Sequence, residues 1–235
     1  MQNEKINRVI TLIDASDIKE SIINLCKVHP GRVIFSTSFS KEDQAISHII
    51  FNNNLQVEVF TLDTGRHFAE TYSTWNNTIE KYKKEIIPYI PNADTLQKFI
   101  TTHGPNSFFD SVENRKQCCY IRKVLPLQLA LAHKEIWITG IRAEHSADRH
   151  DMPMVEYDAA NNIVKYHPLL HWTTDDVAKF INENNVPYNP LQDKGFVSIG
   201  CQPCTRAIKK GEDFRAGRWW WEETNKKECG LHVHQ

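Results

Sequence analysis

The sequence predicts an α/β fold, in which helices flank a mostly parallel β-sheet. Apolar runs rich in β-branched residues, typical of buried strands, alternate along the chain with longer segments of helical spacing. Alternation of this kind implies βαβ units and a sheet that is covered on both faces. The predicted strands are residues 32–39, 57–63, 85–90 and 135–141.

Helices are predicted between and around these strands. Residues 18–31 form a helical pattern that ends at Pro30 and Gly31, both of which disfavour a continuing helix. Helical spacing recurs at residues 41–53, 67–84 and 119–134, and a last helix, residues 173–185, begins with threonine caps. Beyond Pro187 the periodicity fades. We therefore expect one domain over residues 1–205 and an appended C-terminal segment over residues 206–235.

Composition argues against several classes of function. The chain has 235 residues, of which 40% are apolar and 24% charged, and its formal net charge is −1, as in ordinary globular proteins. A charge so near zero gives no global attraction to nucleic acid or to an anionic membrane. No stretch approaches the roughly 20 apolar residues of a membrane span. The N-terminus lacks the plan of a signal peptide. We expect a cytoplasmic protein, with homo-oligomerisation left open.

Polar residues follow the first predicted strand, at the kind of position where an open parallel sheet binds ligands. The turn at residues 36–43 is rich in hydroxyl groups and leads into a helix. Backbone N–H groups and the helix dipole would make it an anion site, with further donors in Ser36, Ser38 and Ser40 on either side of Phe39. The alternative is a helix N-cap with nothing bound. The turn lacks the spacing of a Walker A loop.

Two further strand ends carry polar residues. The second strand leads into an acidic residue and a tight glycine turn, formed by Asp63, Thr64, Gly65 and Arg66. Such a turn suits contacts to a ribose or nucleotide, and the alternative is an Asx-type turn that precedes a helix. The fourth strand is followed by residues 140–149, which contain several charged side chains.

Four of the six cysteines fall into two pairs. Cys118 and Cys119 are adjacent, and Cys201 and Cys204 form a C-x-x-C motif about eighty residues later. In a reducing compartment such pairs favour a metal site or catalysis over disulfides. Four thiolates can bind zinc or an iron–sulfur cluster, and adjacent cysteines, which are unusual in zinc sites, favour the cluster. Cys26, in an apolar helix, is expected to be a small core residue.

The C-terminal region adds cations, tryptophans and a lone thiol. Arg215 and Arg218 are three positions apart, so on a helix they would share a face and could bind one phosphate or sulfate. The three consecutive tryptophans, residues 219–221, are expected to pack this segment against the domain. Cys229 lies near His232, and a cation beside a cysteine lowers the pKa of its thiol. Without further context, a spare thiol is the simpler interpretation of Cys229.

The chain resembles the adenylyl-sulfate/phosphoadenylyl-sulfate reductase family, most specifically in CCYIRKVLPL, CQPCTRAIKKGEDFRAGRWWWE and ECGLH. The similarity extends over nearly the whole chain, from STSFSKED to ECGLH. It implies an adenine nucleotide α-hydrolase-like, Rossmann-like fold with a mobile C-terminal segment. Related ATP pyrophosphatases carry an S-G-G-x-D-S loop where this chain has residues 38–43. The missing glycines fit an enzyme that binds a nucleotide without releasing pyrophosphate.

The resemblance also implies a cofactor and a substrate. The branch of the family with both cysteine pairs holds a [4Fe-4S] cluster, whose ligands here would be Cys118, Cys119, Cys201 and Cys204. That branch generally uses adenylyl sulfate. The nucleotide contacts would come from the three strand ends, namely Ser36, Ser38, Phe39, Ser40, Asp63, Thr64, Gly65, Arg66, Gly140, Arg142 and Arg149.

By the same resemblance, Cys229 is the nucleophile. Its thiolate would attack the sulfur of adenylyl sulfate and expel AMP, leaving an S-sulfocysteine from which thioredoxin or a similar dithiol protein releases sulfite. The charge that develops on the leaving phosphate would be stabilised by Lys123, Arg215, Arg218 and His232. A thiol that meets a buried substrate and then a protein must move, so the tail is expected to close as a lid.

Three alternatives stay open. A reductase that prefers phosphoadenylyl sulfate, or accepts both nucleotides, is the nearest of them. An ATP-dependent sulfurtransferase would share the fold, although the glycine loop is missing. A zinc-stabilised nucleotide-binding module without catalysis would use the same four cysteines.

Overall fold

A computed structural model describes residues 2–145 and 151–222 and divides the chain into two compact units. The first unit comprises Met1–Thr61, Thr71–Ile87 and Leu131–Asn189, and the second comprises Leu62–Glu70, Pro88–Ala130 and the chain from Pro190 onward. This division differs from the single domain expected over residues 1–205, because residues 62–70, 88–130 and 190–205 group with the segment that follows residue 205.

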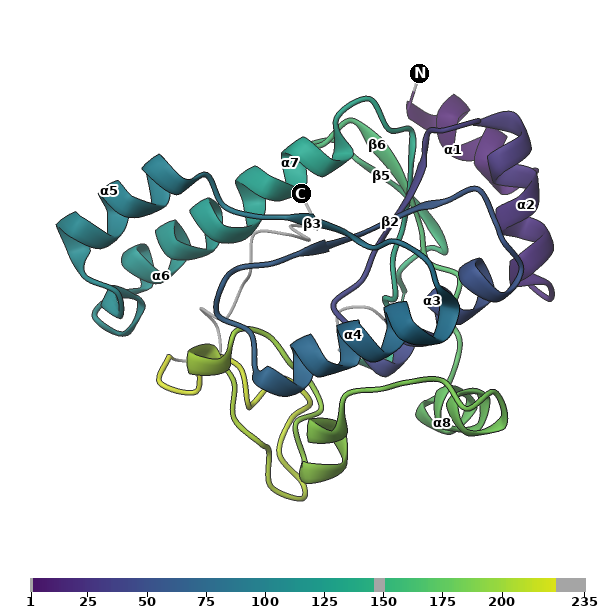
Figure 1. The fold of residues 1–235 in the computed structure, drawn as a ribbon. Helices are drawn as coiled ribbons and strands as arrows, with labels where there is room; N and C mark the ends of the chain where they lie inside the picture. Colours follow the sequence, from purple (N-terminus) through teal and green to yellow (C-terminus); the bar gives the residue numbers. More distant parts are fainter. Residues whose placement is uncertain (1, 146–150, 223–235) are drawn as a thin grey trace. The chain divides into compact units, whose positions relative to one another are not determined.

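The strands form one six-stranded sheet (Figure 1). They are β1 Val33–Ser36, β2 Glu58–Leu62, β3 Ile87–Tyr89, β4 Ile136–Ile138, β5 Val155–Asp158 and β6 Ile163–Tyr166. Their order is β3-β2-β1-β4-β6-β5. β1 is parallel to β2 and to β4, and β4 is parallel to β6, whereas β5 is antiparallel to β6. The predicted α/β fold with a mostly parallel sheet is confirmed.

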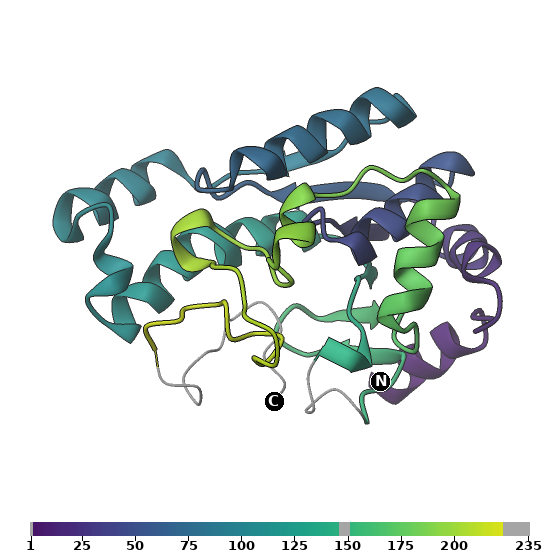
Figure 2. The ribbon, with the colours of Figure 1, turned by 90° about the horizontal axis from the view of Figure 1, so that it is seen from below.

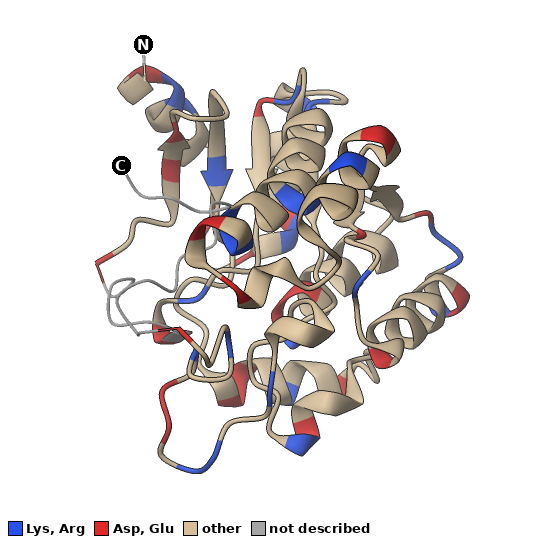
Figure 3. Ribbon diagram, turned by 90° about the vertical axis from the view of Figure 1, so that its left-hand side faces the viewer, with Lys and Arg blue, Asp and Glu red and all other residues tan. Residues whose placement is uncertain are grey.

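Helices connect the strands. They are α1 Gln2–Ile10, α2 Ile18–Val28, α3 Lys41–Asn52, α4 Ala69–Tyr82, α5 Ala93–His103, α6 Val112–Cys119, α7 Leu125–Leu131 and α8 Thr174–Glu183. Asp17, Ser40 and Thr173 cap α2, α3 and α8 by accepting from backbone N–H groups that have no partner inside the helix. Basic and acidic residues are interspersed along helices and loops (Figure 3). Within the described ranges, no helix is long and apolar enough to cross a membrane.

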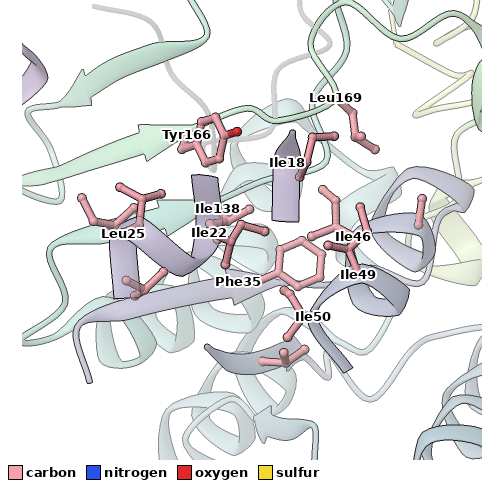
Figure 4. Packing of buried hydrophobic residues seen from close by; sticks show 14 of the residues in the cluster. Ile18, Ile22, Leu25, Phe35, Ile46, Ile49, Ile50, Ile138, Tyr166 and Leu169 are labelled. Atoms are coloured by element: carbon pink, nitrogen blue, oxygen red, sulfur yellow. The ribbon is translucent and has the colours of Figure 1, made fainter. Parts of the chain in front are cut away.

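The main core of the first unit lies between the sheet and the helices α2 and α3 (Figure 4). Phe35 and Ile138, from the neighbouring strands β1 and β4, point to the same side, because side chains alternate between the faces of a sheet. On α2, Ile18, Ile22 and Leu25 recur at helical spacing and form the buried stripe. Burial of such side chains contributes about 1.5–3 kcal/mol each. The core therefore fixes β1 and α3, between which the first candidate turn lies.

The structure has a strand within residues 85–90, as predicted, but the prediction that this strand is buried is wrong. β3 lies at the edge of the sheet and leaves Ile87 39% exposed. Pro88 has no N–H group for a further ladder bond, which restricts such a segment to an edge. The apolar run therefore reflects an edge strand rather than a central one.

The sequence patterns do not predict α1, α5 or the β5–β6 hairpin. α1 is mostly polar and buries Val9, so its apolar stripe is too short to recognise. The hairpin strands have four residues each, and the turn between them holds Asn162 at a φ of 53°. Asparagine tolerates that left-handed conformation, so the Asn161-Asn162 pair is the signal that could have identified this turn.

The order of the sheet changes direction at β1. From β1 the chain adds β2 and β3 on one side and later adds β4 on the other. In open α/β sheets, ligands bind beyond the carboxyl ends of the strands at such a switch point. The turn after β1 and the segment after β4 therefore occupy the position in the first unit at which the fold favours a ligand.

Replacement of Ile22 by alanine tests the importance of the core. Ile22→Ala removes a fully buried side chain from the stripe of α2 and should lower the free energy of unfolding by about 2–5 kcal/mol in urea denaturation. Ile10→Ala is the matched control, because Ile10 is 51% exposed and its truncation should change stability by about 0.5 kcal/mol or less. Equal effects of the two substitutions would contradict the assigned core.

Candidate functional site

In the first unit, the turn after β1 is held by its own side chains. The N–H and Oγ–H groups of Ser38 both donate to Oδ2 of Asp43, at 2.7 Å each. Ser40 caps α3 by accepting from the N–H of Asp43 at 3.2 Å. Oγ of Ser36 accepts from the indole N–H of Trp137 at 2.9 Å. The turn is thus a capped helix start, as the alternative interpretation had it, and anion binding there stays a prediction.

Phe39 lies in the same turn in a left-handed backbone conformation. Its φ is 62°, which is uncommon for a residue that carries a side chain. The ring is buried and stacks on Trp75, with 5.6 Å between the ring centroids. A left-handed residue costs about 1–2 kcal/mol, so the surrounding contacts must hold this conformation in place.

Asp43 is a buried carboxyl group that the sequence analysis does not include among the site residues. Burial raises its pKa to about 6, although hydrogen bonds from Ser38 oppose the shift. Gly140, after β4, leaves room for this carboxyl group, because a Cβ at that position would lie 2.1 Å from Oδ1 of Asp43. An acidic pair, Glu42 and Asp43, directly after a hydroxyl-rich turn is the sequence signal that could have drawn attention to it.

Arg142, two residues after Gly140, is buried in a polar network of the first unit. Its Nε donates to Oε1 of Glu42 at 3.0 Å, and its Nη1 donates to Oε2 of Glu144 at 2.5 Å. The same Nη1 donates to the carbonyl of Trp172, and Nη2 donates to Oγ1 of Thr174. Because each guanidinium nitrogen is engaged, the contacts favour a structural role. The expected contact with a ribose or phosphate stays a prediction.

In the second unit, the turn after β2 is closed by Asp63. Its Oδ1 accepts from the N–H of Gly65 at 2.9 Å, and Gly65 has a φ of 68°. This is the Asx-type turn that the sequence allowed. Thr64 is buried, with Oγ1 3.2 Å from Sγ of Cys201, and its carbonyl accepts from Arg122 at 2.6 Å. The turn is therefore joined directly to one cysteine of the second pair.

Arg66, the last residue of that turn, contacts the segment at residues 105–108 of the second unit. Its Nη2 donates to the carbonyl of Pro105 at 2.5 Å, and its Nη1 donates to Oδ1 of Asn106 at 3.2 Å. The guanidinium also lies over the ring of Phe108, 5.2 Å from the centroid. A role for Arg66 in binding a nucleotide stays a prediction.

The four paired cysteines gather in one small cluster of the second unit. The cluster consists of Phe108, Cys201, Cys204 and Trp219, with Cys118, Cys119 and Trp221 packed against it. The first pair ends α6. In the second pair, Cys201 directly precedes the 3-10 turn Gln202–Cys204 and Cys204 is its last residue. We name this group the thiol cluster. Two pairs that are distant in sequence are thus brought together, as a shared site requires.

A π-helical turn, Tyr120–Val124, directly follows the first cysteine pair and joins α6 to α7 (Figure 1). The N–H of Leu125 donates to the carbonyl of Tyr120, five residues back. Pro126 has no N–H group, and its ring clashes with the carbonyl four residues back. This accounts for the change from α-helical to π-helical hydrogen bonds in the turn before it. The predicted helix at residues 119–134 therefore belongs to a longer helical segment that begins at Val112 and ends at Leu131.

Positive charge surrounds the buried thiols. Burial raises the pKa of Cys118, and the guanidinium of Arg122 opposes this shift. Burial also raises the pKa of Cys204, to about 12, against the charges of Arg218 and Lys123. The thiols of Cys118 and Cys204 are therefore neutral unless a metal centre takes up the charge of their thiolates.

Buried donors in and beside the thiol cluster have no acceptor among the described residues. The Nε groups of Arg122 and Arg218 and the indole N–H of Trp219 are buried, and none has a hydrogen-bond acceptor among the described residues. Unpaired buried donors cost about 1–3 kcal/mol each. Hydrogen bonds to sulfur are among the contacts that tune iron–sulfur clusters. These donors and the four thiols therefore fit a sulfur-rich, anionic group.

The geometry of the cysteines bears on the kind of metal centre. No three histidine, cysteine or acidic side chains in residues 2–145 and 151–222 are arranged to hold a metal ion. A four-iron cluster distributes its four thiolates over separate iron atoms, so its ligands surround a volume rather than a point. The chemistry of the donor set fits such a cluster, and the assignment stays a prediction.

Arg215 and Arg218 do not share a helical face. Among the described residues, the segment from Pro190 contains 3-10 turns and irregular chain but no α-helix (Figure 2). Arg218 is 9% exposed, and its N–H donates to the carbonyl of Arg215 at 2.9 Å. A Cβ on Gly200 would lie 2.4 Å from Nη2 of Arg218, so only glycine leaves room for this guanidinium. The helical arrangement of the two arginines, on which their shared face depended, is wrong.

The three tryptophans, residues 219–221, differ in their burial and contacts. Trp219 is buried, with the guanidinium groups of Arg115 and Arg218 at 4.7 and 4.8 Å from its ring centroid. Trp221 packs on Phe109, whereas Trp220 is 41% exposed. Two of the three therefore pack the segment as predicted.

Arg115 and Glu222 form a buried ion pair that the sequence could not reveal. Nε and Nη2 of Arg115 donate to the two carboxylate oxygens of Glu222 at 2.9 and 2.7 Å. The partners are 107 residues apart, and although Glu222 ends the motif CQPCTRAIKKGEDFRAGRWWWE, nothing in the sequence pairs it with Arg115. This pair fixes the chain at the last described residue. Cys229, His232 and Arg149 lie outside the described residues, and their roles stay predictions.

The sequence matches a family model described as the phosphoadenosine phosphosulfate reductase domain, over residues 32–207. A protein of Burkholderia cepacia named adenosine 5'-phosphosulfate reductase is 46% identical over 202 residues, which cover 86% of this chain and 81% of the relative. A Neisseria meningitidis protein of the same name is 47% identical over 199 residues, or 84% of this chain and 82% of the relative.

Solved structures agree in fold. The phosphoadenylyl-sulfate reductase of Candida auris, in a phosphate complex, matches with a TM-score of 0.70 and 24% identity, covering 87% of this chain and 95% of the other. The FMN adenylyltransferase of Candida glabrata matches with a TM-score of 0.56 and 16% identity, covering 88% and 70%. At these identities the likeness shows the fold, which is the nucleotide α-hydrolase-like fold expected from the sequence. Because the family model spans most of the sequence, the chain belongs to the phosphoadenosine phosphosulfate reductase family.

Proposed function

We propose that this chain is an adenosine 5'-phosphosulfate reductase that uses a [4Fe-4S] cluster. The observation that carries the proposal is the gathering of two distant cysteine pairs into one thiol cluster, beside buried donors that have no acceptor among the described residues. The substrate is supported by relatives of that name that are 46% and 47% identical.

The reaction needs one reactive thiol outside the thiol cluster, and we assign that role to Cys229. Its thiolate attacks the sulfur of adenylyl sulfate. The bond between sulfur and the bridging oxygen breaks, AMP leaves with the bonding electrons, and the enzyme keeps an S-sulfocysteine. A dithiol protein such as thioredoxin then attacks Sγ of Cys229 and releases sulfite. Its second thiol resolves the mixed disulfide, so two thiols are oxidised while the sulfur is reduced.

The leaving group is a phosphate, so negative charge develops on its bridging oxygen as the bond breaks. Cations held in a water-poor site stabilise such charge most strongly. We assign this role to Lys123, Arg215, Arg218 and His232. The buried guanidinium of Arg218, whose Nε has no acceptor among the described residues, supports the assignment.

The cofactor is assigned to the four thiols of the thiol cluster, Cys118, Cys119, Cys201 and Cys204. When bound, the cluster would supply structural and electrostatic stabilisation rather than electrons, because the dithiol protein provides both electrons. Lys123 follows the first pair in the π-helical turn, and its charge acts on Cys204. We infer that Lys123 links the charge of the thiol cluster to that of the substrate.

The nucleotide contacts are proposed at the strand ends, and they comprise Ser36, Ser38, Phe39, Ser40, Asp63, Thr64, Gly65, Arg66, Gly140 and Arg149. Arg142 was expected among them, but its engaged guanidinium favours a different role. A cytoplasmic location and a closing tail are also proposals. The first rests on cysteine usage typical of a reducing compartment, and the second on the two partners that Cys229 must meet.

A reductase that prefers phosphoadenylyl sulfate is the second candidate, favoured by the description of the matching family model. Parallel assays of sulfite release with the two nucleotides and thioredoxin separate the candidates. Faster turnover of the 3'-phosphorylated nucleotide at equal concentration would overturn the proposed substrate.

Mass spectrometry tests the proposed nucleophile. Anaerobic incubation of the full chain with adenylyl sulfate, without a reductant, should add the mass of one sulfonate to the peptide that contains Cys229. Cys229→Ser should abolish both the adduct and sulfite release. Cys26→Ser is the control, because burial raises the pKa of Cys26 to about 11 and keeps its thiol neutral. An adduct on another cysteine would refute the assignment.

Substitution of Gly200 tests the role of Arg218 without removing it. Gly200→Ala should displace the flexible guanidinium, because the added Cβ would lie 2.4 Å from Nη2. We expect kcat/KM to fall about tenfold or more, with little loss of stability. Arg218→Ala should have an effect at least as large, and the double variant should be no worse than Arg218→Ala alone. Additive losses would show that Gly200 acts independently of Arg218.

A further inference from the structure

Two acidic residues tie the start of α3 to the segment after β4 in the first unit. Oε1 of Glu42 accepts from Nε of Arg142 at 3.0 Å. The carboxyl group of Asp43 packs against Gly140, where a Cβ would be only 2.1 Å from Oδ1. We name these four residues, Glu42, Asp43, Gly140 and Arg142, the clasp. Glu42, Asp43 and Arg142 are at most 8% exposed, so the clasp is closed to solvent.

The clasp lies at the switch point of the sheet. β1 and β4 are adjacent and parallel, with Phe35 beside Ile138 near their carboxyl ends. The chain that leaves β1 reaches Asp43 through the hydroxyl-rich turn, and the chain that leaves β4 reaches Gly140. Open α/β sheets bind ligands at this position. The clasp therefore joins the two segments that would flank a bound nucleotide.

The turn inside the clasp needs support. Phe39 has a φ of 62°, and such a conformation persists only where surrounding contacts over-determine it. Asp43 supplies two of these contacts, by accepting from the N–H and the Oγ–H of Ser38 at 2.7 Å each. The carboxyl group thus fixes the residue that directly precedes Phe39.

The buried carboxyl group of Asp43 lowers the stability of the fold when it is ionised. This cost indicates that the clasp has a role other than stabilisation. Burial raises the pKa of Asp43 to about 6, so the ionised form is disfavoured where it lies. The native state therefore binds this proton more tightly than the unfolded chain, and stability falls as the pH rises from about 4 to 6. A neutral amide at this position could accept from Ser38 without that cost.

We propose that Asp43 is a positioning residue, which holds the turn at residues 36–40 in the conformation that receives the nucleotide phosphate. Arg142 supports it by holding Glu42 at the start of α3, and neither residue contacts the nucleotide. The inference rests on the proposed function and assigns to Arg142 a role other than the contact expected from the sequence. Its physical basis is pre-organisation: a turn that is already ordered spends less binding free energy on becoming ordered.

Substitution of Asp43 tests the proposal with AMP as the probe. Asp43→Ala removes the acceptor of both Ser38 bonds and should raise the Kd for AMP and the KM for adenylyl sulfate about tenfold or more. The rate of S-sulfocysteine formation at saturating substrate should change by about threefold or less, because the chemistry lies elsewhere. Asp43→Asn keeps an acceptor and should restore affinity to within about threefold of the natural protein.

Asp17→Ala provides the matched control. Asp17 caps α2 in the same unit by accepting from the N–H of Glu20, so its loss destabilises a helix start without touching the turn. AMP affinity should stay within about twofold of the natural protein. Unchanged AMP affinity in folded Asp43→Ala, or equal losses in the alanine and asparagine variants, would overturn the proposal.

Hydrogen exchange of the natural protein keeps the proposal falsifiable even if the variants do not fold. The peptide that contains Ser38 should be protected before AMP is added, because its N–H is already bonded to Asp43. Protection that arises only after AMP binds would contradict pre-organisation. Failure of the natural protein to bind AMP at all would instead refute the proposed function, so the two failures are distinguishable.

Discussion

Four thiols gathered in a small, largely apolar cluster, with guanidinium groups beside them, impose the constraint on which the second unit depends. Burial raises the pKa of Cys118 and Cys204, so their thiolates need a metal centre to take up the charge. The segment from Pro190 has no α-helix within the described residues, and its Trp219 and Trp221 pack with the four cysteines. A group bound by the thiols would therefore stabilise the fold and prepare the chemistry together.

The donors at the turn after β1 and those beside the four cysteines differ in how they are paired. In the first unit, the donors of Ser38 and Arg142 are engaged by carboxylates of the same unit, so the turn after β1 is ordered from within. In the second unit, the buried Nε groups of Arg122 and Arg218 have no acceptor among the described residues. The first arrangement orders the turn before a ligand arrives, and the second leaves buried donors available to an anionic group.

Sequence periodicity predicted most of the sheet and helices because apolar residues recur at strand or helix spacing. It could not predict the burial of residues 85–90, since edge position depends on the order of strands and not on the run itself. The cysteine pairs were recognisable because few chemistries use thiols in that pattern. The Arg115–Glu222 pair was not, because its partners are 107 residues apart and only the fold brings them near. Asp43 follows a hydroxyl-rich turn, but its burial against Gly140 depends on the fold. The helical face for Arg215 and Arg218 failed because that segment forms turns.

Metal and sulfide analysis of the full chain, purified without oxygen, tests the central claim most directly. A thiol cluster that holds one [4Fe-4S] group should yield about four iron atoms and about four acid-labile sulfides per chain, with broad absorption near 400 nm. Cys118→Ser and Cys204→Ser, one from each pair, should both lose that content, whereas Cys26→Ser should keep it. Zinc in place of iron, or iron content that survives substitution in either pair, would contradict the account.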